Sequence, residues 1–156
     1  KLDDYETSLV AQRRLEALYE AEHGPRPAMP KNIHHTIYKD YYVNNDGSTD
    51  PNQHYFIRLA WDKVKEANSY IVYEYDVRND KYIRCAGTTT DMGLSIDVGT
   101  LMTYTTYFEN GVQKSKYEYR AATKNYLILA VNDNGYSKYD AADVYTVTIV
   151  PDGMTP

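Results

Sequence analysis

The stretch "YLILAVNDNGYSKYDAADVYTVTIV", residues 126–150, decides the fold. Tyr126 to Val131 is a short run of strand-forming residues, "NDNG" breaks it, and Val144 to Val150 is a second such run. Aromatic and β-branched residues favour strands, whereas Asn, Asp and Gly favour turns. The stretch therefore predicts a strand, a turn and a second strand, and it contains no residue pattern typical of catalysis.

The rest of the chain beyond residue 31 shows the same alternation of short strands and turns. Tyr55, Ile57, Leu59 and Trp61 alternate with other residues, which predicts one buried strand face. A hairpin is expected over 101–121, because Asn110-Gly111 is the strongest two-residue turn signal in the chain. Seven or eight short strands without an intervening helix predict a mainly β, antiparallel, two-sheet immunoglobulin-like sandwich. The other expected strands are 32–43, 54–61, 69–77, 82–90 and 93–98, with a turn-rich loop at 44–53.

The first 24 residues differ, because they predict one α-helix, over 3–23, that Gly24 and Pro25 end. Asp3 or Asp4 can cap it. Its apolar stripe is narrow, so we expect the helix to pack through one side, on its own domain or on a neighbouring copy. The Pro-rich residues 25–30 predict a stiff connector, followed by a domain at 31–150 and a tail at 151–156. The candidate assembly residues of the helix are Leu9, Leu15, Leu18 and Tyr19.

Three segments resemble strands of a fibronectin type III domain. "LAWDKVKEANSYIVYEY", residues 59–75, resembles its strands B and C, and "KYIRCAGTTTDMGLSIDVGT", residues 81–100, its C′ and E region. "LAVNDNGYS", residues 129–137, is similar to the end of its strand F. The resemblance covers residues 31–150 and implies the sandwich fold without implying a function. The matching positions are Trp61, Tyr70, Val72, Ala130, Val131, Asn132, Gly135 and Ser137.

The chain departs from that family in two places. The family's tyrosine corner belongs about six residues before Ala130, where this chain has Lys124. Either Tyr126 or Tyr119 substitutes for it, or the corner is missing. The hairpin at 101–121 is an insertion before strand F.

Composition excludes several classes of partner. The 156 residues carry a net charge of −5, with 17 basic residues scattered among 22 acidic ones, so nucleic acid is not an expected partner. No apolar run approaches the ~20 residues of a membrane span. The single cysteine, Cys85, cannot form an intrachain disulfide and is expected to be buried or half-buried. Because the chain begins at Lys1 without an apolar signal region, we expect a processed chain or a piece of a longer one.

No catalytic or metal-binding constellation is evident. The sequence lacks a nucleophile elbow, a phosphate loop and a His-Glu-X-X-His motif, so we expect neither an enzyme nor a cofactor. His34 and His35 are adjacent in a predicted strand, where neighbouring side chains point to opposite faces and cannot chelate together. "NNDGSTD", residues 44–50, lacks carboxylates at the first and last positions of a calcium loop, so a plain Asx-rich turn is expected.

Aromatic side chains are the main candidates for contacts, since the chain has 18 tyrosines. If Tyr70 and Val72 face the core, then Tyr73 and Tyr75 face outward. Rows of aromatic rings can anchor a protein interface, stack on sugars, or be covered by the helix or the domain itself. The candidate contact residues are Tyr73, Tyr75, Tyr104, Tyr107, Phe108, Tyr117 and Tyr119.

The leading hypothesis is a non-catalytic module that makes protein–protein contacts, with copies of itself or with neighbouring domains. The expected setting is an extracellular assembly, a cell-surface appendage, an adhesin or a virion surface. The alternative is an accessory carbohydrate-binding module of a secreted polysaccharide-degrading enzyme, for which the partner is a polysaccharide. Fold alone does not choose between them.

Overall fold

A computed structural model describes residues 2–79 and 81–152, and within the helix it describes the side chains of residues 10, 11 and 13–23. The described residues form one long helix, α1 (Leu2–His23), followed by strands and a short 3-10 helix, Ala141–Asp143. The strands are β1 (His34–Val43), β2 (Thr49–Ala60), β3 (Ser69–Asp76), β4 (Lys81–Thr89), β5 (Gly93–Gly99), β6 (Met102–Glu109), β7 (Val112–Tyr119), β8 (Ala122–Asn132), β9 (Gly135–Tyr136) and β10 (Tyr145–Ile149).

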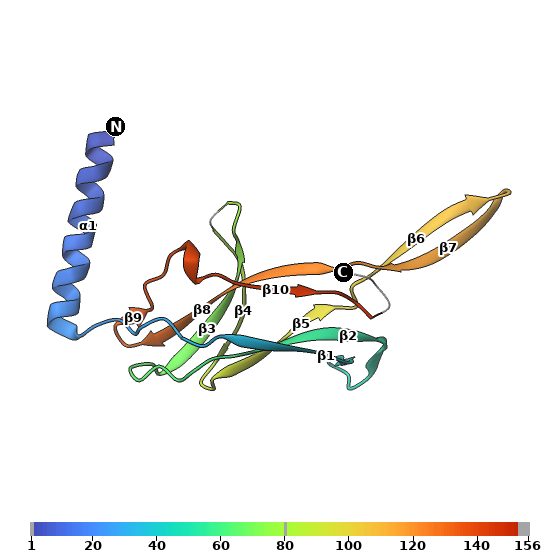
Figure 1. The fold of residues 1–156 in the computed structure, drawn as a ribbon, viewed down its shortest axis with the longest axis horizontal. Helices are drawn as coiled ribbons and strands as arrows, with labels where there is room; N and C mark the ends of the chain where they lie inside the picture. The colour runs from blue at the N-terminus through green and yellow to red at the C-terminus, as the bar shows by residue number, and fades with distance from the viewer. Residues whose placement is uncertain (1, 80, 153–156) are drawn as a thin grey trace.

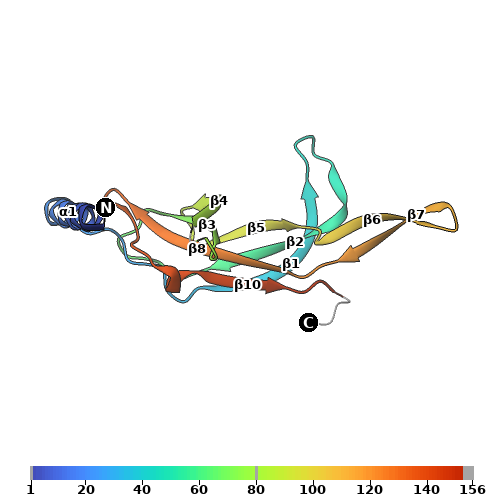
Figure 2. The same cartoon turned by 90° about the horizontal axis from the view of Figure 1, so that it is seen from above.

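Two antiparallel sheets face each other and form the sandwich (Figures 1 and 2). One sheet has the order β1-β2-β5, and the other has the order β10-β8-β3-β4, with β9 paired to the end of β8. The mainly β, two-sheet fold with a preceding helix is therefore confirmed. The stretch at 126–150 forms β8 and β10 as predicted, but β10 pairs with the first half of β8, not directly across the turn.

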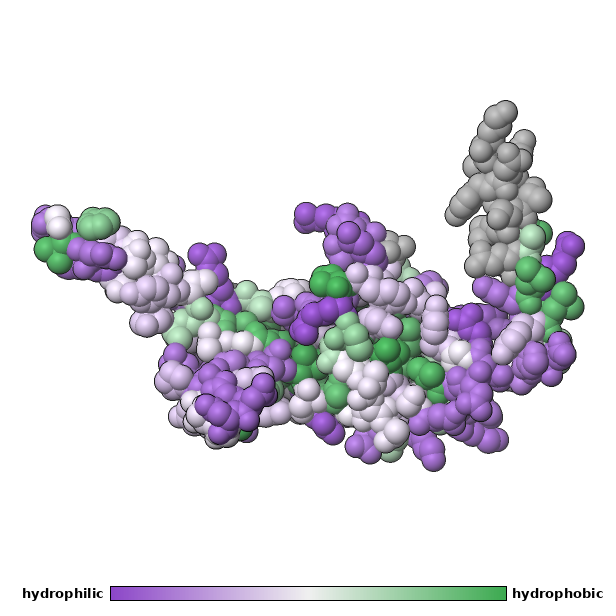
Figure 3. Space-filling model, turned by 180° about the vertical axis from the view of Figure 1, so that it is seen from behind, coloured by the Kyte–Doolittle hydropathy of each residue, from purple (hydrophilic) through white to green (hydrophobic). Residues whose placement is uncertain are grey.

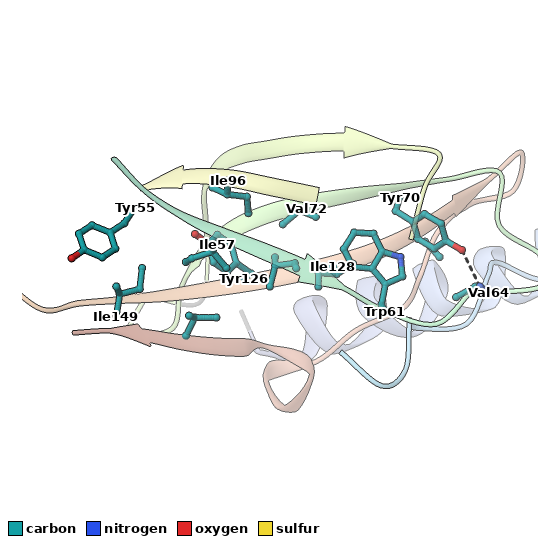
Figure 4. Close-up of a cluster of buried hydrophobic side chains, with 13 residues drawn as sticks. Tyr55, Ile57, Trp61, Val64, Tyr70, Val72, Ile96, Tyr126, Ile128 and Ile149 are labelled. Carbon is teal, nitrogen blue, oxygen red and sulfur yellow. Dashed lines mark hydrogen bonds between the residues drawn. The ribbon is translucent and has the colours of Figure 1, made fainter. Parts of the chain in front are cut away.

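The core between the sheets is filled by the residues that the alternation predicts (Figure 4). Tyr55, Ile57, Leu59 and Trp61 are all buried. The ring of Trp61 lies 5.4 Å from that of Tyr70, centroid to centroid. The Tyr70 hydroxyl accepts a hydrogen bond of 2.9 Å from the backbone N–H of Val64, which joins the chain between β2 and β3 to the core. From the facing sheet the core also receives Tyr70, Val72, Tyr126, Ile128, Ala130, Val147 and Ile149.

The outer face of the β8-β3 sheet is covered by the segment that joins β9 to β10. Tyr75 lies against Leu127 and Leu129 in a second apolar cluster, and Tyr139 and Val144 of that segment pack on it. Tyr73 belongs to the same cluster and is half-buried. Tyr75 points outward from the sheet, as expected, but it is only 4% exposed, because the domain itself covers it. The alternation placed it on the correct face, but the covering segment is remote in sequence.

The connector after α1 lies along the turn between β8 and β9. The Arg26 Nε donates to the Tyr136 carbonyl oxygen at 2.6 Å, and the buried Ser137 hydroxyl donates to the Ala28 carbonyl oxygen at 3.0 Å. Pro27 and Pro30 are buried. The connector is therefore packed on the sandwich by hydrogen bonds and apolar contacts, while the predicted domain start at residue 31 stays a prediction.

Helix α1 stands away from both sheets and covers neither (Figure 1). Of the alternatives for the aromatic faces, cover by this helix is not what the structure shows, because its contacts with the sandwich lie at its last turns. Glu20 forms an ion pair of 2.8 Å with Lys138 there. The expected cap, Asp3 or Asp4, lies outside the described side chains.

Two further local expectations fail for reasons of register. The loop expected at 44–53 shrinks to a turn over residues 44–48, because β1 and β2 pair beyond the sandwich as far as Val43 and Thr49. Within the turn, Gly47 has a φ of +87°, and Asp46 accepts from Ser48 as in an Asx-turn. Cys85 is exposed, because β4 is the edge strand of its sheet and its pairing with β3 shifts register at Tyr73.

Candidate functional site

The β6–β7 hairpin projects from the sandwich and forms a sheet of its own (Figures 1 and 2). Among the described residues its strands pair only with each other, in an unbroken register from Met102–Tyr119 at the base to Glu109–Val112 at the tip. Asn110 and Gly111 have φ angles of 53° and 77°, as the predicted tight turn requires. Nearly all residues of both strands are exposed.

One face of this hairpin carries no charge. Side chains directly opposite each other in an antiparallel pair share a face, and every second pair shares the same face. The pairs on this side are therefore Met102–Tyr119, Tyr104–Tyr117, Thr106–Ser115 and Phe108–Gln113. We call these eight residues the neutral face.

The opposite face holds all four charged residues of the two strands. They form two ion pairs, Lys114–Glu109 at 3.3 Å and Lys116–Glu118 at 3.0 Å. The Lys116 ammonium also lies 5.9 Å from the centre of the Tyr107 ring. The hydrogen bond and charge of Lys116 hold the pKa of the Glu118 carboxyl below its usual range. This face is thus a solvated one, and the hairpin has two chemically different sides.

The aromatic rings of the neutral face are exposed but not coplanar. Tyr104, Phe108, Tyr117 and Tyr119 are between 47 and 74% exposed. The rings of Tyr104 and Tyr117 lie 5.0 Å apart with an interplanar angle of 53°. The rings of Tyr104 and Tyr117 therefore do not form a flat platform.

The structure divides the seven predicted contact residues into three groups. Tyr104, Phe108, Tyr117 and Tyr119 come together on the neutral face. Tyr107 lies on the charged face of the same hairpin. Tyr73 and Tyr75 lie in the second apolar cluster of the sandwich, away from the hairpin.

The predicted contact residues of helix α1 are divided between its sandwich-facing side and its exposed side. Glu16, Tyr19 and Glu20 line a hollow shared with Arg26 and Tyr136, so this side faces the sandwich. At about 100° per residue, Leu18 lies on the other side of the helix and Leu15 lies at the flank, next to Tyr19; both leucines are exposed. Tyr19 is also partly exposed. The side chain of Leu9 lies outside the described residues.

Two charged clusters could not be predicted from the sequence, because their members come from different strands. The Glu74 carboxylate accepts from Arg84 Nε at 2.7 Å and from Lys124 Nζ at 3.3 Å, which links β3, β4 and β8. The His54 ring lies between two carboxylates, with Nδ1 2.9 Å from Asp97 and Nε2 2.9 Å from Asp50. The alternation in β3 places Glu74 on the same side as Tyr70 and Val72. This is the only sequence signal for either cluster.

The histidine pair behaves as the strand geometry predicts. His34 Nδ1 lies 2.9 Å from the Asn32 carbonyl oxygen, and His35 Nδ1 lies 2.6 Å from the Tyr145 hydroxyl. The two rings thus have different partners. Within residues 2–79 and 81–152, no three His, Cys, Asp or Glu side chains gather as a metal site would require. The same residues contain no helix of the length and hydropathy needed to cross a membrane.

Comparisons with known proteins give distant similarities. No protein-family model and no curated protein matches the sequence. The chain is similar to a solved structure described as FN3tt, with 16% identity and a TM-score of 0.48 over 80% of this chain and 95% of that one. It is similar to the glycoside hydrolase domain of Endo-D from Streptococcus pneumoniae R6, with 17% identity and a TM-score of 0.44, over 81% of this chain and 15% of that one. On its own strand order, with β1-β2-β5 facing β10-β8-β3-β4, the chain is a fibronectin type III-like β-sandwich with an N-terminal helix and an inserted hairpin.

Proposed function

We propose that this chain is a non-catalytic structural module that makes protein–protein contacts through the β6–β7 hairpin. The observation that supports it is the separation of neutral and charged side chains on the two faces of an uncovered hairpin. A two-stranded hairpin alone is marginally stable in water, so covering its neutral face would stabilise it. A contiguous aromatic surface rimmed by polar residues is typical of an interaction site.

The tilt of the rings favours a protein over a polysaccharide as the partner. Stacking on the flat faces of successive sugars calls for ring faces that lie in one plane, whereas Tyr104 and Tyr117 are inclined by 53°. Inclined rings can instead interdigitate with the side chains of a protein surface. The accessory carbohydrate-binding function is therefore the second candidate, supported by the exposed aromatic residues alone.

Helix α1 has the position of a tether in this proposal. It leaves the sandwich at the end opposite the hairpin, as Figure 3 shows from behind. Its exposed Leu15 and Leu18 are available to a neighbouring protein. The setting that we propose for such a module is an extracellular or particle-surface assembly, such as an appendage, adhesin or virion.

A paired titration tests the proposed function. The full chain is measured by light scattering from micromolar to millimolar concentration, and by tyrosine emission during titration with soluble neutral glucans and xylans. We expect the molar mass to rise with concentration and the emission to stay constant. A response to polysaccharide without any rise in mass would replace the protein-contact function by the carbohydrate-binding one.

A further inference from the structure

We propose that the neutral face of the β6–β7 hairpin binds the same face of a second copy, so that two chains pair about a two-fold axis. This inference rests on the proposed function and names the partner at that site. A two-fold interface uses the same surface patch on both chains, so the patch must be complementary to itself. The neutral face meets that condition in its charge, its order of side chains and its area.

Charge favours a second copy on this face. The chain carries a net charge of −5, so two copies repel each other at long range, and a contact face without charges adds nothing to that repulsion. The neutral face contributes only aromatic, methionine, hydroxyl and amide side chains. Pairing it with itself buries no unpaired charge, which is the costly event at an interface. The ion pairs of Glu109 and Glu118 stay on the opposite, solvated side.

The order of side chains along the face is suited to an antiparallel pair. Phe108 lies at the tip, Met102 and Tyr119 lie at the base, and Tyr104 lies between them with Tyr117. A two-fold axis through the middle of the face places the tip of each hairpin on the base of the other. Every ring is then covered, and Thr106 lies next to the axis with Ser115.

The area is sufficient for such a pair. Each of the four rings can bury ~200 Å² when fully covered, so at their observed exposure they offer on the order of 500 Å² per copy. Both copies together, with the four intervening side chains, reach about the 1,200 Å² at which specific interfaces begin. Both ribbon views show the hairpin projecting from the sandwich, so a second hairpin can approach its middle and tip (Figures 1 and 2). At its base, Met102 and Tyr119 line a hollow with Lys39 and Asp152 of the sandwich.

Two adjacent threonines provide a matched test. Thr105 and Thr106 are both exposed, but Thr106 lies on the neutral face and Thr105 on the charged face. The full chain and the variants Thr106→Glu and Thr105→Glu are compared by sedimentation equilibrium, with circular dichroism to confirm the fold. We expect the wild type to approach twice its 18.0 kDa. The dissociation constant should rise by at least about tenfold in Thr106→Glu, which places a charge inside the interface, and stay unchanged in Thr105→Glu.

Two cysteine variants test the same geometry by crosslinking, without adding charge. In a Cys85→Ser background, which removes the exposed native thiol, Thr106→Cys and Thr105→Cys are treated with a short bismaleimide. Covalent dimers from Thr106→Cys alone support the pairing. A wild type that stays monomeric at millimolar concentration, or equal effects of the two Glu variants, overturns it. Equal effects with a rising mass would mean that copies associate elsewhere on the chain, so protein contact would stand while its assignment to the hairpin would fall.

Discussion

Tyr126 lies in the strand that the sequence predicts, but the sequence does not predict the surroundings of its hydroxyl group. Its side chain is fully buried, and its hydroxyl has no hydrogen-bond partner among the described residues. Burial, with the charge of Glu74 added, raises the pKa of this hydroxyl well above its usual range. Tyr119 is exposed on the hairpin, so neither tyrosine substitutes for the corner, and Lys124 contacts Glu74 instead.

We expect Tyr126→Phe to raise the free energy of unfolding by about 1 kcal/mol, because it removes a buried polar atom without a partner. Tyr70→Phe is the matched control, since the Tyr70 hydroxyl accepts from the Val64 N–H. That control should lower the free energy of unfolding by ~1 kcal/mol or more. Urea denaturation measures both. Equal losses in the two variants would mean that the Tyr126 hydroxyl has a partner.

Glu74 predicts a pH dependence of stability. Burial on its own raises the pKa of this carboxyl, but the hydrogen bond from Arg84 and the charge of Lys124 outweigh it, so the pKa lies below its ordinary 4.5. A lowered folded-state pKa contributes stability above the unfolded value, which is lost as the pH falls through the folded value. We expect Glu74→Gln to be less stable by about 1 kcal/mol at pH 7. The difference should shrink below a pH of about 4.5, where the unfolded-state carboxyl begins to bind a proton.

Unfolding curves of both proteins at pH 7, 5 and 3 measure this change. Glu118→Gln is a suitable control, because its carboxylate lies on the exposed face of the hairpin and its ion pair with Lys116 is solvated. If Glu74→Gln lowers the free energy of unfolding by the same amount at all three pH values, the lowered pKa of Glu74 is contradicted.

At the scale of elements, the β6–β7 hairpin is the part that local sequence predicts best. Its register follows from the Asn110-Gly111 turn, and its charged face follows from the alternation on either side. We expect Gly111→Ala to destabilise the hairpin by roughly 1 kcal/mol, because its φ of 77° is unfavourable for a residue with a Cβ atom.

Amide hydrogen exchange should locate this effect. Protection should fall in β6 and β7 and stay unchanged in β3 and β8, because the hairpin shares no sheet with them. Asn110→Gly keeps a residue that tolerates positive φ and should leave exchange in the hairpin nearly unchanged. Loss of protection across the sandwich in Gly111→Ala would show that the hairpin is not an independent element.

The same scale shows where sequence reasoning fails. Alternation identified the buried face of β2 and the core side of β3, because it depends only on neighbours in the chain. It could not identify what lies on the outer side of β3, since Tyr139 and Val144 reach Tyr75 from a distant segment. The exposure of Cys85 depends likewise on a register shift between β3 and β4 that no local pattern encodes.

At the scale of the whole molecule, the helix and the hairpin lie at opposite ends of the sandwich (Figure 1). The sequence predicted both elements but could not orient the helix, since its narrow stripe is compatible with packing on the domain or on a neighbour. The orientation comes from the connector, which Ser137 and Arg26 join to the β8–β9 turn. The side of the helix with Glu16, Tyr19 and Glu20 thereby faces the sandwich, whereas Leu18 faces outward.

This arrangement predicts that the connector, and not the helix, stabilises the sandwich. A chain that starts at Gly24 should keep nearly all of the free energy of unfolding of the full chain. Among the described side chains, the ion pair that it loses is that of Glu20 with the largely exposed Lys138. A chain that starts at Pro30 loses the nearer of the two acceptors of the buried Ser137 hydroxyl, since the Ala130 carbonyl oxygen at 3.3 Å remains, and it also loses the buried Pro27. Its free energy of unfolding should be lower by about 2 kcal/mol. Ser137→Ala in the full chain should give about half of that loss. If the chain from Gly24 is already as unstable as the chain from Pro30, the helix itself covers the sandwich in solution, and its stripe is not free for a neighbour.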